Sequence, residues 1–177
     1  FVYTSTSEIY GKNQSLPWSE SADQVLGPPT APRWSYSASK TVSEHMIHAL
    51  GRENNGFSTA VVRPFNLYGP NQREQFVISK FMQQVSNGEV PTVYGDGTQR
   101  RCFTYIDDFI DGLVAASERD HDDTEVYNLG GTDEIEIREL AEEILSLGGM
   151  ADSEPAFVSR DEVHGEDFED PDRRIPD

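Results

Sequence analysis

Apolar residues follow two patterns along this chain, continuous runs and helical spacing. A continuous apolar run occupies residues 57–65, residues 1–4 resemble a buried strand, and shorter strand-like segments occupy 125–131 and, with a glycine turn, 91–99. Short apolar runs that end at Gly or Pro are typical of strands buried on both faces of a parallel sheet. We therefore expect strands in these four segments.

Four further segments carry apolar residues at i, i+3 and i+4, which predicts helices. We expect them from about residue 36 to 54, over 77–88, after a cap at Asp107 or Asp108, and from residue 137. Their apolar positions are Val42, Met46, Ala49 and Leu50; Val77, Ile78, Phe81, Met82 and Val85; Phe109, Ile110, Leu113 and Val114; and Ile137, Leu140, Ala141, Ile144 and Leu145. Strands that alternate with helices predict an α/β fold with a parallel sheet.

The two ends of the chain predict that it is a piece of a longer protein. Residue 1 is Phe, and the strand expected at 1–4 has no preceding segment to supply a neighbour in a sheet. Near the other end, residues 151–172 are acidic and without apolar period, so a loop or partly ordered arm is expected there. We therefore take 1–177 as a fragment of one domain.

The charge balance excludes one class of function. The chain has 32 acidic and 14 basic residues, a formal net charge of −18, and its only lysines are Lys12, Lys40 and Lys80. A field of this sign repels phosphate backbones, so nucleic-acid binding is not expected. A lysine-poor acidic surface suits concentrated salt, which screens self-repulsion, and this favours a halophilic source over an ordinary acidic protein.

The cysteine content, the length of the apolar runs and the spacing of the histidines bear on the cellular setting, on membrane spans and on metal binding. Cys102 is the sole cysteine, so no internal disulfide can form and a reducing, cytoplasmic setting is expected. No apolar run approaches the ~20 residues that span a bilayer. His45 and His48 share a helix face without a third ligand at suitable spacing, so no metal site is expected.

The stretch RWSYSASK places Tyr36 four residues before Lys40. On a helix these two side chains project from the same face, one turn apart. A nearby ammonium favours the phenolate form of a tyrosine, which makes the pair suitable for base chemistry. Taken alone, the pair is also compatible with an ordinary surface helix.

Polar residues also follow two of the expected strands directly. Thr6, Ser7 and Glu8 come after the first strand in TSTSEIYG, and RPFNLYGP ends the second. Open α/β sheets build their sites at the carboxyl ends of the strands. A hydroxyl at one strand end and a Tyr–Lys pair on the next helix can therefore converge on one substrate hydroxyl.

Together with YGDGTQRRCFTYIDD, these motifs resemble the extended short-chain dehydrogenase/reductase family, and within it the nucleotide-sugar epimerases, dehydratases and decarboxylases. The resemblance runs over residues 1–177. It implies the C-terminal part of a doubly wound, Rossmann-like parallel sheet with a small substrate-binding subdomain. It also implies NAD as cofactor, a nucleotide sugar such as a UDP-sugar as substrate, and a homodimer.

The resemblance assigns roles to individual residues. Thr6 matches the catalytic hydroxyl, Tyr36 the catalytic base, and Lys40 the lysine that holds the cofactor ribose. Pro64 matches a residue beside the nicotinamide. The residues that match the substrate-binding set are Ser7, Asn66, Thr92, Tyr94, Arg101 and Arg174. Within this set Asn66 and Arg101 match residues at the sugar diphosphate, Thr92 and Tyr94 match residues at the base and ribose, and Arg174 matches a second nucleotide-side arginine. In the implied mechanism Tyr36 takes the proton of the sugar C4 hydroxyl while NAD accepts the hydride from that carbon.

Oxidation at C4 gives a 4-keto sugar, and Glu8 is the residue that bears on which product forms from it. Dehydratases of the family resemble TDE at this position, whereas Ser7 replaces the middle acid here. The TSE triplet, PRWSYSASK and QRRCFT look most like the UDP-glucuronate decarboxylases, including those of lipid A modification. UDP-glucose 4-epimerases and nucleotide-sugar 4,6-dehydratases remain the alternatives, since some dehydratases also carry TSE.

The family's glycine-rich dinucleotide loop does not occur in this chain. Neither GxxGxxG nor GxGxxG is present, so the half that cradles the cofactor pyrophosphate is expected to lie outside it. This leaves a hypothesis of another class. The chain could be a non-catalytic half of a split protein that binds a sugar nucleotide or pairs with another polypeptide.

Overall fold

The computed structural model describes residues 1–53, 58–120, 123–159 and 173–177, and these form two compact units. The first unit, here called the sheet unit, comprises residues 1–67, 102–132 and 174–177. The second unit comprises residues 68–101 and 133–173. Each unit is described by itself.

The sheet unit is built on three parallel strands. These are β1 (Val2–Thr4), β2 (Thr59–Pro64) and β7 (Thr124–Leu129), in the order β1-β2-β7. Val61 in the central strand lies opposite Tyr3 on one side and Val126 on the other. The segments expected as strands at 1–4, 57–65 and 125–131 are therefore neighbours in one parallel sheet, and the predicted α/β fold class is confirmed.

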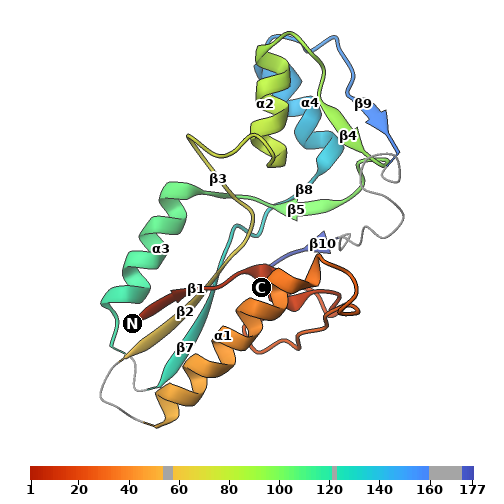
Figure 1. Ribbon diagram of the computed structural model, residues 1–177. Coiled ribbons are helices and arrows are strands. Elements are labelled where there is room, and N and C mark those ends of the chain that lie inside the picture. The colour runs from red at the N-terminus through yellow and green to blue at the C-terminus, as the bar shows by residue number, and fades with distance from the viewer. Residues whose placement is uncertain (54–57, 121–122, 160–172) are drawn as a thin grey trace. The chain divides into compact units, whose positions relative to one another are not determined.

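Helices cover both faces of this sheet (Figure 1). Ala60 and Val62 of β2 pack with Phe109 of α3 (Ile106–Glu118). Because side chains alternate across a strand, the neighbouring Arg63 points to the opposite face, where it binds a side chain of α1 (Trp34–Arg52). Burial on both faces explains why β2 is a continuous run rather than an alternating one.

A second apolar cluster forms where β1 leaves the sheet. The chain enters a short 3-10 helix, η1 (Ser7–Tyr10), and then a long loop that leads to α1. Ile9, Tyr10, Trp18 and Phe65 are all buried together, with the Tyr10 and Trp18 rings stacked at a centroid distance of 4.9 Å. This cluster fixes the segment that follows β1 against the end of β2.

The second unit contains two helices and short strands. Helix α2 (Val77–Ser86) packs against α4 (Ile137–Leu147), and β4 (Thr92–Tyr94) pairs in parallel with β9 (Ala156–Val158). The remaining strands of the chain are β3 (Leu67–Tyr68), β5 (Arg100–Cys102), β6 (Thr104–Tyr105), β8 (Glu134–Glu136) and β10 (Arg173–Arg174). They form the sheets β10-β5-β8 and β3-β6.

Two local predictions were wrong. The N-cap of α3 is Tyr105, and Asp107 and Asp108 lie inside its first turn. Their negative charges there stabilise the helix through its dipole instead of through a capping bond. The segment expected to be irregular over 151–172 contains β9, whose pairing with β4 supplies the order that its sequence does not; residues 160–172 lie outside the described ranges.

The apolar positions of α1 also differ from the expected buried face. Val42, Met46 and Leu50 are exposed in the described part of the chain. The buried residues of α1 are Trp34, Ser37 and Glu44. The helix therefore turns a largely polar face toward the sheet, and the apolar period identified the helix but not its buried side.

Candidate active site

The segment after β1 carries the predicted hydroxyl and carboxylate. Thr6 is the N-cap of η1, and its Oγ1 accepts a hydrogen bond from the amide of Glu8 at 3.2 Å. A hydroxyl that accepts a bond still carries a proton to donate, so Thr6 can also serve a substrate oxygen. Thr6 and Ser7 are buried, whereas Glu8 is partly exposed.

Glu8 lies beside an arginine from the other end of the chain. The Nη1 atom of Arg174 is 3.3 Å from Oε1 of Glu8, with side chains 9% and 30% exposed respectively. The adjacent residue Ile175 is held in place because its carbonyl accepts a bond from the amide of Trp18 at 2.8 Å. The structure thus brings together two predicted site residues that are 166 positions apart.

Tyr36 and Lys40 lie in the first turns of α1, as their spacing predicts. The Nζ of Lys40 donates to the carbonyl of Thr4 at 2.8 Å and lies 6.0 Å from the centre of the Tyr36 ring. Tyr36 is 50% exposed. Since Thr4 ends β1 and α1 packs against η1, Lys40 joins the helix to the strand end that precedes Thr6.

Pro64 and Asn66 lie at the carboxyl end of β2, the neighbour of β1 in the sheet. Asn66 adopts a positive φ of 36°, a region that Asn occupies more readily than most residues. Its Nδ2 donates to the carbonyl of Cys102 at 2.8 Å. The parallel strands thus place RPFN and TSE at the same edge of the sheet.

The other predicted binding residues belong to the second unit. The side-chain amide of Gln84 holds Thr92 twice, through Oγ1 at 2.9 Å and through the backbone amide at 3.1 Å. The hydroxyl of Tyr94 accepts a hydrogen bond from Nζ of Lys80. Arg101 is mostly buried, and its Nη1 donates to the carbonyl of Arg100 at 2.8 Å. The structure therefore places Thr92 and Tyr94 on one strand and Arg101 on another of the same unit.

A buried ionic network in the sheet unit was missed by the sequence analysis. Nε and Nη2 of Arg63 donate to the Glu44 carboxylate at 3.1 and 2.5 Å, and Nη1 donates to the Tyr10 hydroxyl at 2.7 Å. Burial opposes the charge of Arg63, but Glu44 and Tyr10 outweigh it and raise the pKa of the guanidinium; burial raises the pKa of Tyr10. The signal was present in VVRPF, where an arginine interrupts a buried apolar strand.

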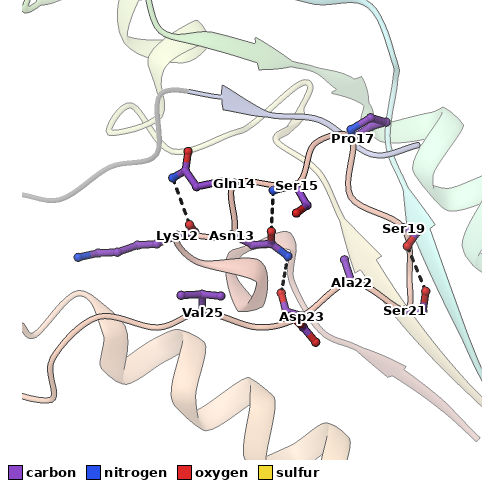
Figure 2. A pocket seen from close by; sticks show the side chains of 10 residues that line it. All are labelled: Lys12, Asn13, Gln14, Ser15, Pro17, Ser19, Ser21, Ala22, Asp23 and Val25. Atoms are coloured by element: carbon purple, nitrogen blue, oxygen red, sulfur yellow. Dashed lines mark hydrogen bonds between the residues drawn. The ribbon is translucent and has the colours of Figure 1, made fainter.

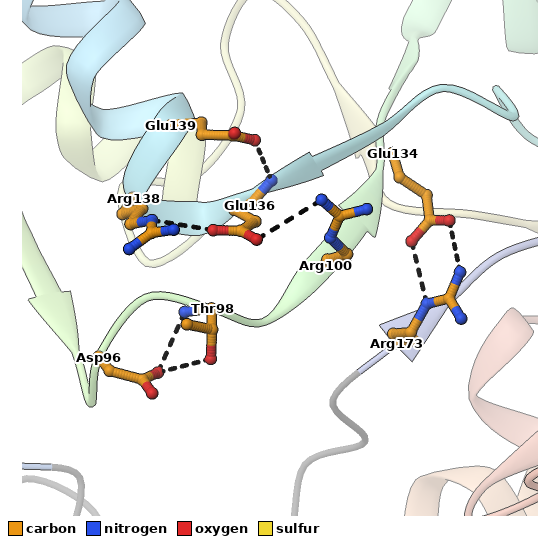
Figure 3. Close-up of polar contacts among 8 residues, drawn as sticks. All are labelled: Asp96, Thr98, Arg100, Glu134, Glu136, Arg138, Glu139 and Arg173. Atoms are coloured by element: carbon orange, nitrogen blue, oxygen red, sulfur yellow. Dashed lines mark hydrogen bonds and ion pairs between the residues drawn. The ribbon is translucent and has the colours of Figure 1, made fainter.

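Ion pairs in the second unit serve its local structure (Figure 3). Glu136 binds Arg138 at 2.8 Å and Arg100 at 3.5 Å, so β8 is joined to α4 and to β5. Arg173 makes a two-point pair with Glu134 at 2.6 and 3.1 Å. None of these five residues was predicted to belong to the site.

A pocket of about 560 Å³ lies in the loop between η1 and α1 (Figure 2). Hydrogen bonds connect the residues that line it. Nδ2 of Asn13 donates to the carbonyl of Asp23 at 2.7 Å, and Oδ1 of Asn13 accepts from the amide of Ser15 at 2.7 Å. Its lining residues all lie between positions 12 and 25 and include none of the predicted site residues. The pocket is therefore separate from the candidate site.

Two kinds of feature are absent from the part of the chain that the structure describes. No helix there has both the length and the apolar character needed to cross a membrane. No group of three His, Cys, Asp or Glu side chains in that part of the chain is placed to hold a metal ion.

Residues 1–130 match the model of the NAD dependent epimerase/dehydratase family. The chain belongs to this family. Members of the family use NAD. The exposed phenol of Tyr36 and the ammonium of Lys40 are hydrogen-bond donors, and they fit the hydroxyls of the cofactor ribose.

Individual relatives of the family are similar over the whole chain. The UDP-N-acetyl-alpha-D-glucosaminuronate decarboxylase of Bacillus cytotoxicus is 36% identical over 99% of this chain and 54% of its own length. A UDP-N-acetylglucosamine 4-epimerase structure from Methanobrevibacter ruminantium is 28% identical, with a TM-score of 0.83, over 99% of this chain and 53% of that one. A UDP-glucuronic acid 4-epimerase of Bacillus cereus, bound to UDP-glucuronic acid and NAD, is 31% identical, with a TM-score of 0.80, over 100% of this chain and 52% of that one.

The chain thus spans about half the length of the relatives that it matches. The predicted family, the α/β fold class and the NAD cofactor are confirmed. The coarse chemistry of the family is decarboxylation, epimerisation or dehydration of nucleotide sugars.

Proposed function

We propose that this chain forms part of an NAD-dependent UDP-glucuronate decarboxylase that works through a 4-keto sugar. The single observation that carries the proposal is the contact between Arg174 and Glu8, 3.3 Å apart, beside Thr6. It brings a guanidinium, the usual partner of a carboxylate, to the segment that also carries the hydroxyl assigned to the sugar C4. The similarity to a sugar-uronate decarboxylase supports the same reading.

In this proposal the residues of the sheet unit carry out the oxidation at C4. Tyr36, as phenolate, takes the proton of the C4 hydroxyl, and the Lys40 ammonium stabilises that phenolate. The hydroxyl of Thr6 donates a hydrogen bond to the carbonyl oxygen that forms. NAD, when bound, supplies the hydride acceptor for this step and the hydride donor for the reverse one.

Glu8 and Arg174 control the step that follows. With its 4-keto group, the sugar is a β-keto acid, so the C5–C6 bond breaks, carbon dioxide leaves, and the electron pair is held as an enolate. A proton then returns to C5 and the ketone is reduced again. The resemblance assigns Arg174 to the nucleotide side, but its contact with Glu8 favours a place at the sugar. In this proposal Arg174 binds the C6 carboxylate beforehand, and Glu8 keeps it oriented.

The remaining predicted residues hold the rest of the ligands. Ser7 and Asn66 bind the substrate at the edge of the sheet. Thr92, Tyr94 and Arg101 keep the substrate-binding roles that the resemblance of the sequence implies. Arg101 binds the diphosphate through charge-assisted hydrogen bonds. Pro64 shapes the nicotinamide site at the end of β2.

The experiment is product analysis of the full-length protein with UDP-glucuronate, UDP-glucose and dTDP-glucose in separate reactions. The proposal expects carbon dioxide and a UDP-pentose from UDP-glucuronate and no net product from the other two. A 4-epimer would instead support an epimerase, which the similarity to two epimerase structures favours as the second candidate. A 4-keto-6-deoxy sugar would support a dehydratase, and binding without turnover a non-catalytic half.

A further inference from the structure

We infer that Arg63 is a positioning residue that holds the two catalytic segments, α1 and η1, against β2. The inference rests on the proposed function for its consequence in catalysis. Arg63 lies in the central strand and its side chain is only 5% exposed. It has no predicted contact with substrate or cofactor, so its influence must pass through other residues.

The first link of Arg63 is to the helix that carries the proposed base. Its Nη2 is 2.5 Å from Oε2 of Glu44, whose side chain is 4% exposed. Glu44 lies four residues after Lys40 and eight after Tyr36, so the three share one side of α1. The ion pair therefore fixes the rotation of the helix about its own axis, and with it the direction of Tyr36 and Lys40.

The second link of Arg63 is to the segment that carries Thr6 and Glu8. Its Nη1 donates to the hydroxyl of Tyr10, the last residue of η1, at 2.7 Å. That hydroxyl donates in turn to Oδ1 of Asn128 in β7 at 2.7 Å. Tyr10 is thus held on both sides, and η1 cannot shift along the strand ends without breaking these bonds.

The same Nη1 also donates to the carbonyl of Glu20 at 2.8 Å, and Oε1 of Glu20 accepts from the amide of Asn128 at 2.8 Å. A guanidinium presents several donors in a fixed planar fork, which lets one residue serve Glu44, Tyr10 and Glu20 together. A lysine carries the same charge but only a point-like ammonium. The fork, not the charge alone, is what the geometry requires.

The test compares Arg63→Lys and Tyr10→Phe in the full-length protein. Arg138→Lys is the control, because it makes the same substitution at an arginine that pairs with Glu136, and neither residue was predicted to belong to the site. Nicotinamide reduction in a single turnover is measured with UDP-glucuronate, and UDP-sugar binding is measured separately. Hydrogen exchange of the amides of Glu8, Ile9 and Gly11 is followed in the same samples.

We expect Arg63→Lys and Tyr10→Phe to slow hydride transfer by about tenfold to a hundredfold, since misplacement by about 1 Å costs that much. Binding should change by less than about threefold, the exchange of the three amides should rise, and Arg138→Lys should leave all readouts unchanged. A folded Arg63→Lys variant with the wild-type rate and exchange would overturn the inference. If Arg63→Lys does not fold, Tyr10→Phe decides, because it removes one hydroxyl and keeps the stacked ring.

The proposed function can fail separately from this inference. If the wild-type protein reduces no nicotinamide with any of the nucleotide sugars, the proposed function is wrong. The exchange measurement then still decides whether the contacts of Arg63 hold η1, since a rise in Tyr10→Phe supports the inference and no rise refutes it.

Discussion

Lys40 bonds the end of β1, and this contact changes how the Tyr36–Lys40 pair is understood. The spacing in the sequence predicts two adjacent side chains, and Lys40 does lie 6.0 Å from the Tyr36 ring. Its hydrogen bond, however, goes to the carbonyl of Thr4. Lys40 therefore links the helix to the strand in addition to lying beside Tyr36.

We predict that Tyr36→Phe in the full-length protein lowers the rate of hydride transfer by about 10²–10⁴-fold, because a general base is lost. Binding of the UDP-sugar should stay nearly unchanged, since the ring remains. The rate is read from nicotinamide absorbance in a single turnover. Tyr127→Phe is the control, because its hydroxyl donates to Glu125, an exposed residue that was not predicted to belong to the site. A Tyr36→Phe variant that retains most of its rate would remove this residue from the role of base.

We further predict that Arg174→Met weakens the binding of UDP-glucuronate more than the binding of UDP-glucose. The variant loses the cation that faces Glu8, so a sugar with a C6 carboxylate loses a charge-assisted bond that the neutral sugar never makes. The loss should be about tenfold or more in affinity for UDP-glucuronate, which corresponds to one such bond. Calorimetric titration of both ligands measures it, and equal losses for the two would contradict the placement of Arg174 at the sugar.

At the scale of elements, the sequence predicted the helices and strands that local residue patterns determine. It missed the features that depend on contacts between residues far apart in the chain. Strand β2 was predictable because burial on both faces makes it a continuous apolar run. Strands β1 and β7 are only partly buried, but their short β-prone segments still identified them. Strands β3, β6 and β10 have two residues each, so their pairing comes from tertiary contacts that no local pattern records. Likewise, the buried face of α1 is polar because it meets Arg63, and the contact of Glu8 with Arg174 spans almost the whole chain.

Gly97 in the second unit allows a test of how the turn after β4 packs against α4. Gly97 has a φ of +75°, and an added Cβ would lie 2.8 Å from Cβ of Arg138 and 2.9 Å from Cγ1 of Val93. Gly88 has a similar φ of +77° with nothing within 4 Å of an added Cβ. We expect Gly88→Ala to cost about 1–2 kcal/mol of unfolding free energy from the backbone alone. Gly97→Ala should cost about 1–3 kcal/mol more because of overpacking.

Urea unfolding of the two variants in the full-length protein measures this difference. Both substitutions lie in the same unit and carry nearly the same backbone strain, so their difference isolates the packing of the turn against α4. Equal losses of stability would show that the turn does not pack there in solution.

At the scale of the whole molecule, the net charge of −18 predicts a dependence of stability on salt. Self-repulsion is screened over about 10 Å at 0.1 M salt and about 3 Å at 1 M. We therefore expect the melting temperature of the full-length protein to rise with potassium chloride up to about 1 M. Sucrose at equal osmolality is the control for solvent exclusion. A melting temperature that is flat or falls with salt would contradict the proposed adaptation to concentrated salt.

The most direct test of decarboxylation through the 4-keto sugar follows the C6 carbon itself. The full-length protein, supplied with NAD, is incubated with UDP-glucuronate labelled with ¹³C at C6, and the label is followed by NMR. We predict that the label leaves as carbon dioxide and bicarbonate while a UDP-pentose accumulates, and that Tyr36→Phe and Arg174→Met both suppress this release. Retention of the label in a C4 epimer, or release that persists in both variants, would contradict the proposed function and the site on which it rests.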